Sequence, residues 1–313
     1  MAHGKSNHPN VYKLKKNLII GTATGYKYAD MQYFFTSLKA ISFNGDVTIL
    51  VSDDVDTETK NALTEQGVNL IYVPAGVLKF SKRYANSRLW KIHYLPHKLV
   101  YALFNLGSGK IKRLSSYVKK FHLISGSRYC YYYDYLLEHP DKYHLILITD
   151  VRDVIFQADP FSEIKKESVL KFYAEENTIA NSFYTAYWIK HGFGKKALNA
   201  LKNKISICSG TTIGSMGRIM DYLEKMIATQ AKITGGLTGL GGFDQGVHNY
   251  LIHNNYFPGS TVLSNTTGEV ATLGDATPKT LNSDAEFIDK QGRVIPVVHQ
   301  FDRFAELKLK ALS

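Results

Sequence analysis

The chain begins with short apolar runs that alternate with longer segments of mixed polarity. The apolar runs predict strands over 17–25 (ending in a Gly/Thr turn), 46–52 and 68–73. Between them, 29–42 and 56–67 have apolar residues at helical spacing, and the second begins with a cap and ends at a glycine. Strands and helices that alternate in this way indicate a parallel, doubly wound sheet.

The same alternation continues less regularly through the rest of the chain. Helices are predicted in two pieces over 84–106, interrupted by Pro96, and over 125–140, 218–230 and 243–254; strands are predicted over 143–149, 171–176 and 205–215. A glycine-rich loop, 233–242, precedes the last helix and is a candidate lid. From about residue 256 the pattern is irregular and strand-like, closing with 294–304. We therefore predict an α/β fold with a mostly parallel, Rossmann-type sheet flanked by helices and an irregular C-terminal extension.

The composition is that of a globular protein, with 313 residues, 44% of them hydrophobic and 21% charged. No apolar segment approaches the roughly 20 residues that a membrane-spanning helix needs. The N-terminal apolar patch is only about four residues long, which is typical of a first strand and too short for a signal peptide. Two cysteines are too few for a disulfide framework, so we expect a reducing, cytoplasmic environment.

The net charge of +11, from 38 Lys and Arg against 27 Asp and Glu, predicts an anionic partner. Nucleotide phosphates, an acidic glycan, a membrane surface and nucleic acid all fit this charge. The basic residues stand in short scattered groups and form no polybasic tail, so charge alone does not choose among these partners.

The stretch "LILITDVRDVIFQADPF" (145–161) is an apolar strand that ends in Asp150, Asp153 and Asp159, with Arg152 among them. Carboxylates at the end of a buried strand are costly to desolvate unless something pairs with them. One interpretation is a capped turn in which Arg152 neutralises an aspartate. The other is a Mn²⁺ or Mg²⁺ site, which requires the strand to end near Thr149 so that Asp150 and Asp153 converge.

Three further features have both a structural and a functional interpretation. His299 ends the apolar run "VIPVV" and is either a core histidine or a third metal ligand. Asp244 and Gln245 open a helix and either cap it or bind sugar hydroxyls. Arg128 is either a surface arginine or a phosphate contact. By contrast, "GTATG" lacks the spacing of a dinucleotide fingerprint, and "LGSGKIK" lacks the first glycine and the Ser/Thr of a phosphate loop.

Taken together, these residues resemble a glycosyltransferase of the A-type (GT-A) fold, similar to the glycogenin-like and lipooligosaccharide galactosyltransferase-like group. The resemblance covers about 17–304 and is carried by "SRY", "YDYL", "LITDVRDVIFQ", "DQ" and "VVHQFDR". It implies a nucleotide-sugar donor and a divalent cation. The chain departs from the usual Asp-x-Asp motif, since it has Asp-x-x-Asp with Val151 inside, and Cys208 replaces an asparagine.

Carried over by position, the resemblance implies a set of site residues within a single domain, 1–313. The metal ligands would be Asp150, Asp153 and His299, and the catalytic residues beside the donor sugar would be Asp244 and Gln245. The donor would be bound by Gly21, Thr22, Ala23, Arg128 and Arg303, the two arginines offsetting the diphosphate charge. Residues 17–153 would form the nucleotide-binding half, and 154–304 the half for the donor sugar and acceptor.

This interpretation predicts a metal-dependent transfer of a hexose from a nucleoside diphosphate, with UDP expected, to a hydroxyl of a glycan or glycoconjugate. The resemblance favours retention of configuration, whereas an inverting enzyme would use Asp244 as a base. Two alternatives stay open: a nucleotidyltransferase that makes sugar nucleotides, and a non-enzymatic basic module for nucleic acid or acidic polysaccharide. Peripheral contact with a membrane is compatible with the charge, and nucleic acid is not the expected partner.

Overall fold

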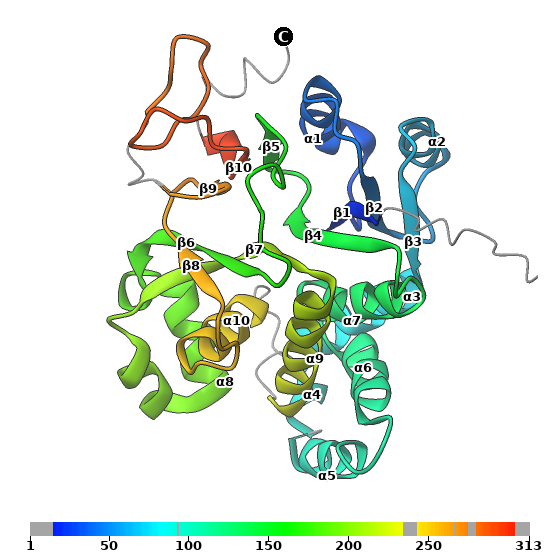
Figure 1. Cartoon of the computed structure of the whole chain (residues 1–313). Helices are drawn as coiled ribbons and strands as arrows, with labels where there is room; N and C mark the ends of the chain where they lie inside the picture. Colours follow the sequence, from blue (N-terminus) through cyan, green and yellow to red (C-terminus); the bar gives the residue numbers. More distant parts are fainter. Residues whose placement is uncertain (1–14, 93, 234–242, 266, 275–279, 304–313) are drawn as a thin grey trace, which may run out of the picture.

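The computed structural model describes residues 15–92, 94–233, 243–265, 267–274 and 280–303 (Figure 1). Its centre is a seven-stranded sheet with the strand order β3-β2-β1-β4-β7-β6-β8. The strands are β1 (Lys16–Thr22), β2 (Asp46–Ser52), β3 (Asn69–Val73), β4 (Tyr143–Asp150), β6 (Leu170–Thr178), β7 (Ile205–Ser215) and β8 (Thr261–Leu263). Strand β7 is antiparallel to its neighbours β4 and β6, and the other pairs in this sheet are parallel.

Helices cover both faces of the sheet. They are α1 (Tyr28–Ala40), α2 (Thr57–Glu65), α3 (Ala75–Asn86), α4 (Leu89–Ile92), α5 (Tyr94–Phe104), α6 (Lys110–Phe121), α7 (Ile124–Leu137), α8 (Phe183–Leu201), α9 (Met216–Lys232) and α10 (Phe243–His253). In the view of Figure 1, α1 and α2 lie above the sheet, and α6, α7, α9 and α10 lie below it.

The apolar runs of β1 and β4 are continuous because successive side chains enter two different cores. Leu18 and Ile148 pack with the tyrosine-rich helix α7 and with α9, whereas Ile19 and Leu147 pack with α1 on the opposite face. All four side chains are buried. This packing holds the carboxyl ends of β1 and β4 side by side.

A second, three-stranded sheet is built from β5 (Val154–Phe156), β10 (Val297–His299) and β9 (Val270–Thr272), in the order β5-β10-β9. Strand β10 is antiparallel to β5 and pairs His299 with Val154. Just beyond the strand, the backbone N–H of Gln300 donates to the carbonyl oxygen of Asp153 at 2.6 Å. The segment around His299 and Gln300 is thereby fixed against the turn between β4 and β5, which contains Asp153.

The predicted α/β class, with a mostly parallel sheet flanked by helices, is confirmed. Helices α6 and α8 and most of α3 are not among the predicted elements, whereas the region predicted to be irregular and strand-like supplies β8, β9 and β10. Pro96 does not separate two helices but lies in the first turn of α5, where its missing N–H has no intrahelical partner to lose. The predicted lid, 233–242, lies outside the described residues apart from Ile233. Within the described ranges, no helix is long and apolar enough to cross a membrane.

Candidate functional site

A cavity opens at the carboxyl ends of β1 and β4. From β1 the chain crosses to β2 on one side, and β4 lies on the other side, which makes this edge a topological switch point, where α/β sheets bind ligands. The cavity has a volume of about 300 Å³. Its walls are Thr22, Thr24, Tyr26, Ile124, Ser125, Arg128, Asp150, Val151, Arg152 and Asp153.

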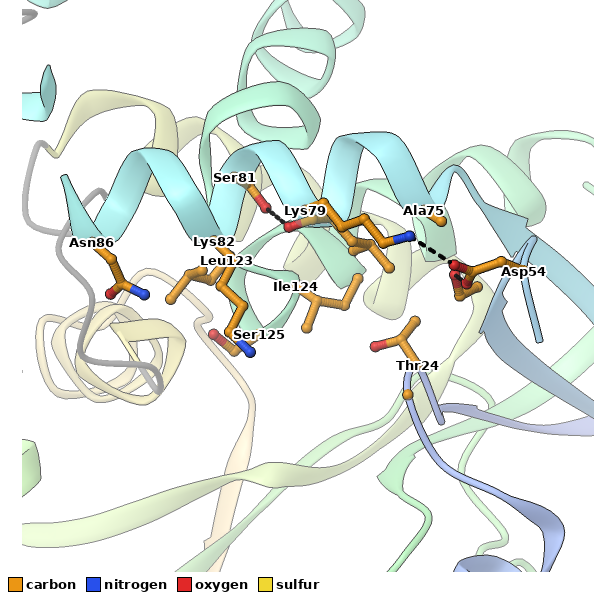
Figure 2. A pocket seen from close by; sticks show the side chains of 13 residues that line it. Thr24, Asp54, Ala75, Lys79, Ser81, Lys82, Asn86, Leu123, Ile124 and Ser125 are labelled. Carbon is orange, nitrogen blue, oxygen red and sulfur yellow. Dashed lines mark hydrogen bonds and ion pairs between the residues drawn. The ribbon is translucent and has the colours of Figure 1, made fainter. Parts of the chain in front are cut away.

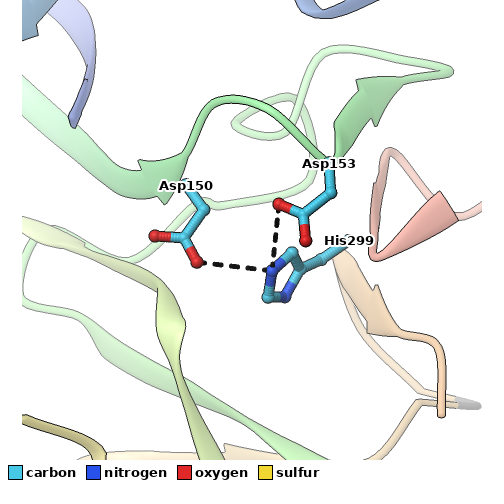
Figure 3. A group of neighbouring side chains, drawn as sticks. All are labelled: Asp150, Asp153 and His299. Carbon is cyan, nitrogen blue, oxygen red and sulfur yellow. Dashed lines mark ion pairs between the residues drawn. The ribbon is translucent and has the colours of Figure 1, made fainter. Parts of the chain in front are cut away.

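Asp150, Asp153 and His299 converge next to this cavity, whose walls include the two aspartates (Figure 3). We name these three residues the acidic cluster. Strand β4 ends at Asp150, and the chain turns before β5 begins at Val154, as convergence requires. Nε2 of His299 lies 3.5 Å from Oδ2 of Asp150 and 3.7 Å from Oδ1 of Asp153. One potential ligand atom from each residue falls within 4.8 Å of the others.

The His299 ring is held from behind. Its Nδ1 lies 3.4 Å from Sγ of Cys208 and 3.5 Å from Oγ1 of Thr272, and the residue is 2% exposed. Its Nε2 is buried and has no hydrogen-bond partner among the described residues. A buried nitrogen that makes no hydrogen bond and faces two carboxylates at ion-pair distance is suited to share a bound cation with them.

The charges of the cluster are strongly coupled. Burial raises the pKa of Asp150, but Arg128 and His299 outweigh burial and hold this pKa well below its usual range. Burial raises the pKa of Asp153, and the nearby charge of Asp150 adds to the rise. Burial lowers the pKa of His299, but Cys208, Asp150 and Asp153 outweigh it and hold this pKa above its usual value.

Arg128, from helix α7, connects the acidic cluster to a carboxylate outside it, that of Asp244. Its Nη1 donates to Oδ1 of Asp150 at 2.6 Å, and its Nη2 donates to Oδ2 of Asp244 at 2.9 Å and to the carbonyl oxygen of Ser209 at 3.2 Å. Asp244 is 2% exposed and also accepts a hydrogen bond from the hydroxyl of Tyr129 at 3.2 Å. Burial raises the pKa of Asp244, and the charge of Arg128 opposes that rise.

Two glycines allow the backbone to approach the site closely. A Cβ on Gly21 would lie 2.5 Å from the side chain of Val151 and 2.8 Å from the carbonyl oxygen of Thr149. A Cβ on Gly210, in β7, would lie 2.6 Å from Oδ2 of Asp150 and 2.7 Å from Cε1 of His299. The absence of a side chain at Gly210 therefore leaves open the space next to the Asp150 carboxylate and the His299 ring. Gly210 was not among the predicted site residues.

A second cavity, of about 520 Å³, adjoins the first (Figure 2). Thr24, Ile124 and Ser125 line both. The further walls of the larger cavity come from the end of β2, the turn after it and α3, including Ser52, Asp54, Leu78, Lys79 and Lys82. Nζ of Lys79 lies 3.1 Å from Oδ2 of Asp54. The two cavities form one elongated site that runs along the carboxyl edge of the sheet.

The predicted donor-binding residues at the end of β1 differ in their position relative to the cavity, and their roles stay predictions. Of Gly21, Thr22 and Ala23, only Thr22 is among the cavity-lining residues, because Gly21 packs against β4 and Ala23 is 1% exposed. Thr24 and Tyr26, a few positions later, were missed, although they lie in the same strand-to-turn segment.

Two other predicted site residues, Gln245 and Arg303, line neither of these two cavities. The Gln245 amide donates to Oε1 of Glu175 and to Oγ1 of Thr185, both at 3.1 Å. Arg303 is exposed, and among the described residues the arginines paired with the cluster are Arg128 and Arg152. The functional roles of Gln245 and Arg303 stay predictions.

The described residues fit a divalent cation at the acidic cluster. Two carboxylates and one imidazole nitrogen form a ligand set that suits Mn²⁺ or Mg²⁺. Structural zinc sites, by contrast, are usually rich in cysteine sulfur. The observations that support this fit are the Nε2 of His299, which is buried and makes no hydrogen bond to the described residues, and the space in front of Gly210. Cys208 contacts the far side of the ring and so would orient the histidine without binding the cation.

No protein-family model matches the chain, and no curated protein matches it. Among solved structures, the chain is similar to core-mannan synthase A from Aspergillus fumigatus in its Mn/GDP form. The TM-score is 0.40 and the sequence identity is 14%, with 78% of this chain and 71% of that chain covered. This distant likeness assigns no role to any residue described above.

Proposed function

We propose that the chain is a metal-dependent glycosyltransferase that moves a hexose from a nucleoside diphosphate, with UDP expected, to a hydroxyl of a glycan acceptor. The observation that carries this proposal is the acidic cluster at the switch point of the sheet, beside an elongated double cavity. The sequence resemblance to GT-A glycosyltransferases supports the same reaction class. Retention of configuration, as that resemblance favours, is part of the proposal.

The donor would lie along the double cavity. The larger cavity, with Leu78 and Ile124 in its walls, would hold the nucleoside, and a diphosphate in the smaller one would lie beside the acidic cluster. Helix α7 begins at Ile124 between them, and the positive end of a helix dipole favours phosphate at that point. Arg152, which is half exposed and lines the smaller cavity, adds a positive charge there.

Asp150, Asp153 and His299 would hold Mn²⁺ or Mg²⁺. When bound, the cation acts as a Lewis acid that neutralises the charge of the leaving diphosphate. Arg128 keeps the Asp150 carboxylate ionised and fixes its orientation. Asp244 fixes Arg128 in turn, and because this carboxylate is enclosed by Arg128, Tyr129 and Ser209, we assign it a positioning role and not that of a catalytic base.

The test is nucleotide release from a panel of UDP-, GDP- and dTDP-sugars, with and without Mn²⁺. We expect metal-dependent cleavage of one donor, and we expect Asp153→Asn to reduce it about a hundredfold or more while the protein stays folded. Asp159→Asn is the matched control, since Asp159 follows in the same segment but bonds only to its own turn. UDP with Mn²⁺ at a hundred times the dissociation constant should stabilise the parent protein by about 2.7 kcal/mol. Absence of both nucleotide binding and cleavage for every donor would refute the proposal.

A further inference from the structure

The excess of positive over negative charge in this chain is concentrated in one segment. Residues 75–121, which contain α3, α4, α5 and α6, include 11 Lys and Arg and neither Asp nor Glu. This number equals the net charge of the whole chain, so the remaining 27 Lys and Arg balance the 27 Asp and Glu. Lys79 of this segment pairs with Asp54, and Lys119 pairs with Asp134, and both carboxylates lie outside the segment.

The same segment also exposes large apolar side chains. Thirteen such side chains are exposed in the described part of the chain, and five of them lie between residues 89 and 106. These five are Leu89 (54% exposed), Ile92 (70%), Leu99 (64%), Leu103 (57%) and Leu106 (65%). Five exposed apolar side chains within 18 consecutive residues are more than the singly scattered ones that a protein surface normally carries, and such a concentration is typical of an interaction surface.

Helix α5 exposes Leu99 and Leu103 on one face. Leu99, Leu103 and Leu106 follow at intervals of four and three, which places them on the same side of the helix and the turn after it. The opposite side packs inward, with His97 buried and Tyr101 and Phe104 against the main core. The helix is thus apolar on two sides, and only one of them is covered by the described protein.

The outward leucines are held in place by the fold. The Arg113 guanidinium, from α6, donates to the carbonyl oxygens of Phe104 at 3.3 Å and Ser108 at 3.0 Å, and also to that of Leu106. These bonds fix the turn between α5 and α6. In Figure 1, α5 lies at the lower extremity of the molecule, on the far side of α6 and α9 from the sheet.

From these observations we infer that the α4–α5 surface (Leu89, Ile92, Leu99, Leu103 and Leu106), together with the basic residues of the adjoining helix α6, docks the protein on an anionic lipid bilayer. Aliphatic side chains would enter the boundary between headgroups and acyl chains, and Lys and Arg would pair with lipid phosphates. Nucleic acid fits this surface less well. Proteins bind it through basic grooves and stacking aromatic side chains, and exposed leucines contribute to neither kind of contact. The inference does not depend on the proposed reaction.

The experiment is co-sedimentation of the full chain with vesicles of phosphatidylcholine alone and of phosphatidylcholine mixed with phosphatidylglycerol. We expect binding to the mixed vesicles that weakens with salt, and much weaker binding to the neutral ones. Leu99→Ser with Leu103→Ser should weaken the binding by about a hundredfold or more. Lys110→Gln with Lys112→Gln should weaken it by about fivefold for each charge removed.

Each variant has a matched control outside the segment. Lys165→Gln with Lys166→Gln removes the same charge from an exposed pair, and Phe183→Ser removes the large apolar side chain that is most exposed among the described residues. Both controls should bind the mixed vesicles like the parent protein, and circular dichroism should show that all variants are folded. The inference is overturned if the parent protein binds neither vesicle, if the lysine controls lose as much binding as the segment variants, or if duplex DNA competes fully with the mixed vesicles.

Discussion

Asp150 and Asp244 both accept a hydrogen bond from Arg128, yet they lie in opposite environments. Asp150 faces the cavity with about a third of its side chain exposed, and its pKa is held well below the usual range. Asp244 is enclosed at the start of α10, and burial raises its pKa. The same pairing therefore leaves one carboxylate available to a ligand and makes the other part of the scaffold that holds the arginine.

Of the two carboxylates that pair with Arg128, loss of the enclosed one, Asp244, should destabilise the fold more. Asp244→Ala leaves a buried guanidinium without its enclosed partner, and we expect it to lower the free energy of unfolding by about 3–5 kcal/mol, measured with urea. Asp150→Ala should cost about 1 kcal/mol, because Asp150 is partly exposed and Arg128 keeps Asp244. Equal costs for the two variants would contradict the distinction between them.

The cavity side can be tested separately through two glycines of β7. Gly210→Ala would place a methyl group 2.6 Å from Oδ2 of Asp150, so stabilisation by saturating Mn²⁺, about 2.7 kcal/mol at a hundred times the dissociation constant, should disappear. Gly214→Ala is the matched control, since its methyl group would contact the side chains of Ile219 and Leu170 at 3.0–3.1 Å, away from the cluster. Its Mn²⁺ stabilisation should be kept; if both variants lose it, the effect is not local to the cluster.

The enclosed side should also respond to acid through His248, which lies on α10 with Asp244. Burial, with the nearby charges of His253 and Arg128, lowers the pKa of His248 to about 3, and its Nδ1 contacts the Tyr222 hydroxyl at 2.8 Å. Between this value and the unfolded pKa of about 6.5, the unfolded chain binds a proton that the folded protein does not. His248 should therefore reduce stability by about 1.4 kcal/mol for each pH unit well below 6.5.

The measurement is urea unfolding of the parent protein and of His248→Gln across this pH range. Other buried histidines contribute to the parent slope, so the difference between the two slopes isolates His248. The variant should lose about 1.4 kcal/mol less per pH unit. Parallel slopes would show that His248 takes up its proton as readily in the folded protein as in the unfolded chain.

The sequence predicts those parts of the site that depend on local patterns. Apolar runs locate β1 and β4, and the three-residue spacing of Asp150 and Asp153 predicts their convergence once the strand ends between them. Gly210 also had a signal, because a glycine inside a strand often marks a close approach of backbone to another group.

The rest of the site depends on pairings between distant elements. The contact of Arg128 with Asp244 joins helices α7 and α10, and nothing in either helix specifies the other. His299 reaches Asp153 only through the register of β10 on β5. Helix α8 was missed partly because Gly194, with φ +88°, interrupts its helical pattern. Local periodicity contains no information on any of these pairings.

The return of β10 to β5 has a consequence for the order in which the protein is made. Almost half of the chain separates Asp153 from His299, so a growing polypeptide has both aspartates and all seven strands of the central sheet before it has the histidine. A nascent chain would thus acquire its full ligand set only after β10 has been synthesised and has paired with β5. Until then, early cation capture by an incomplete protein would have to rely on two carboxylates alone.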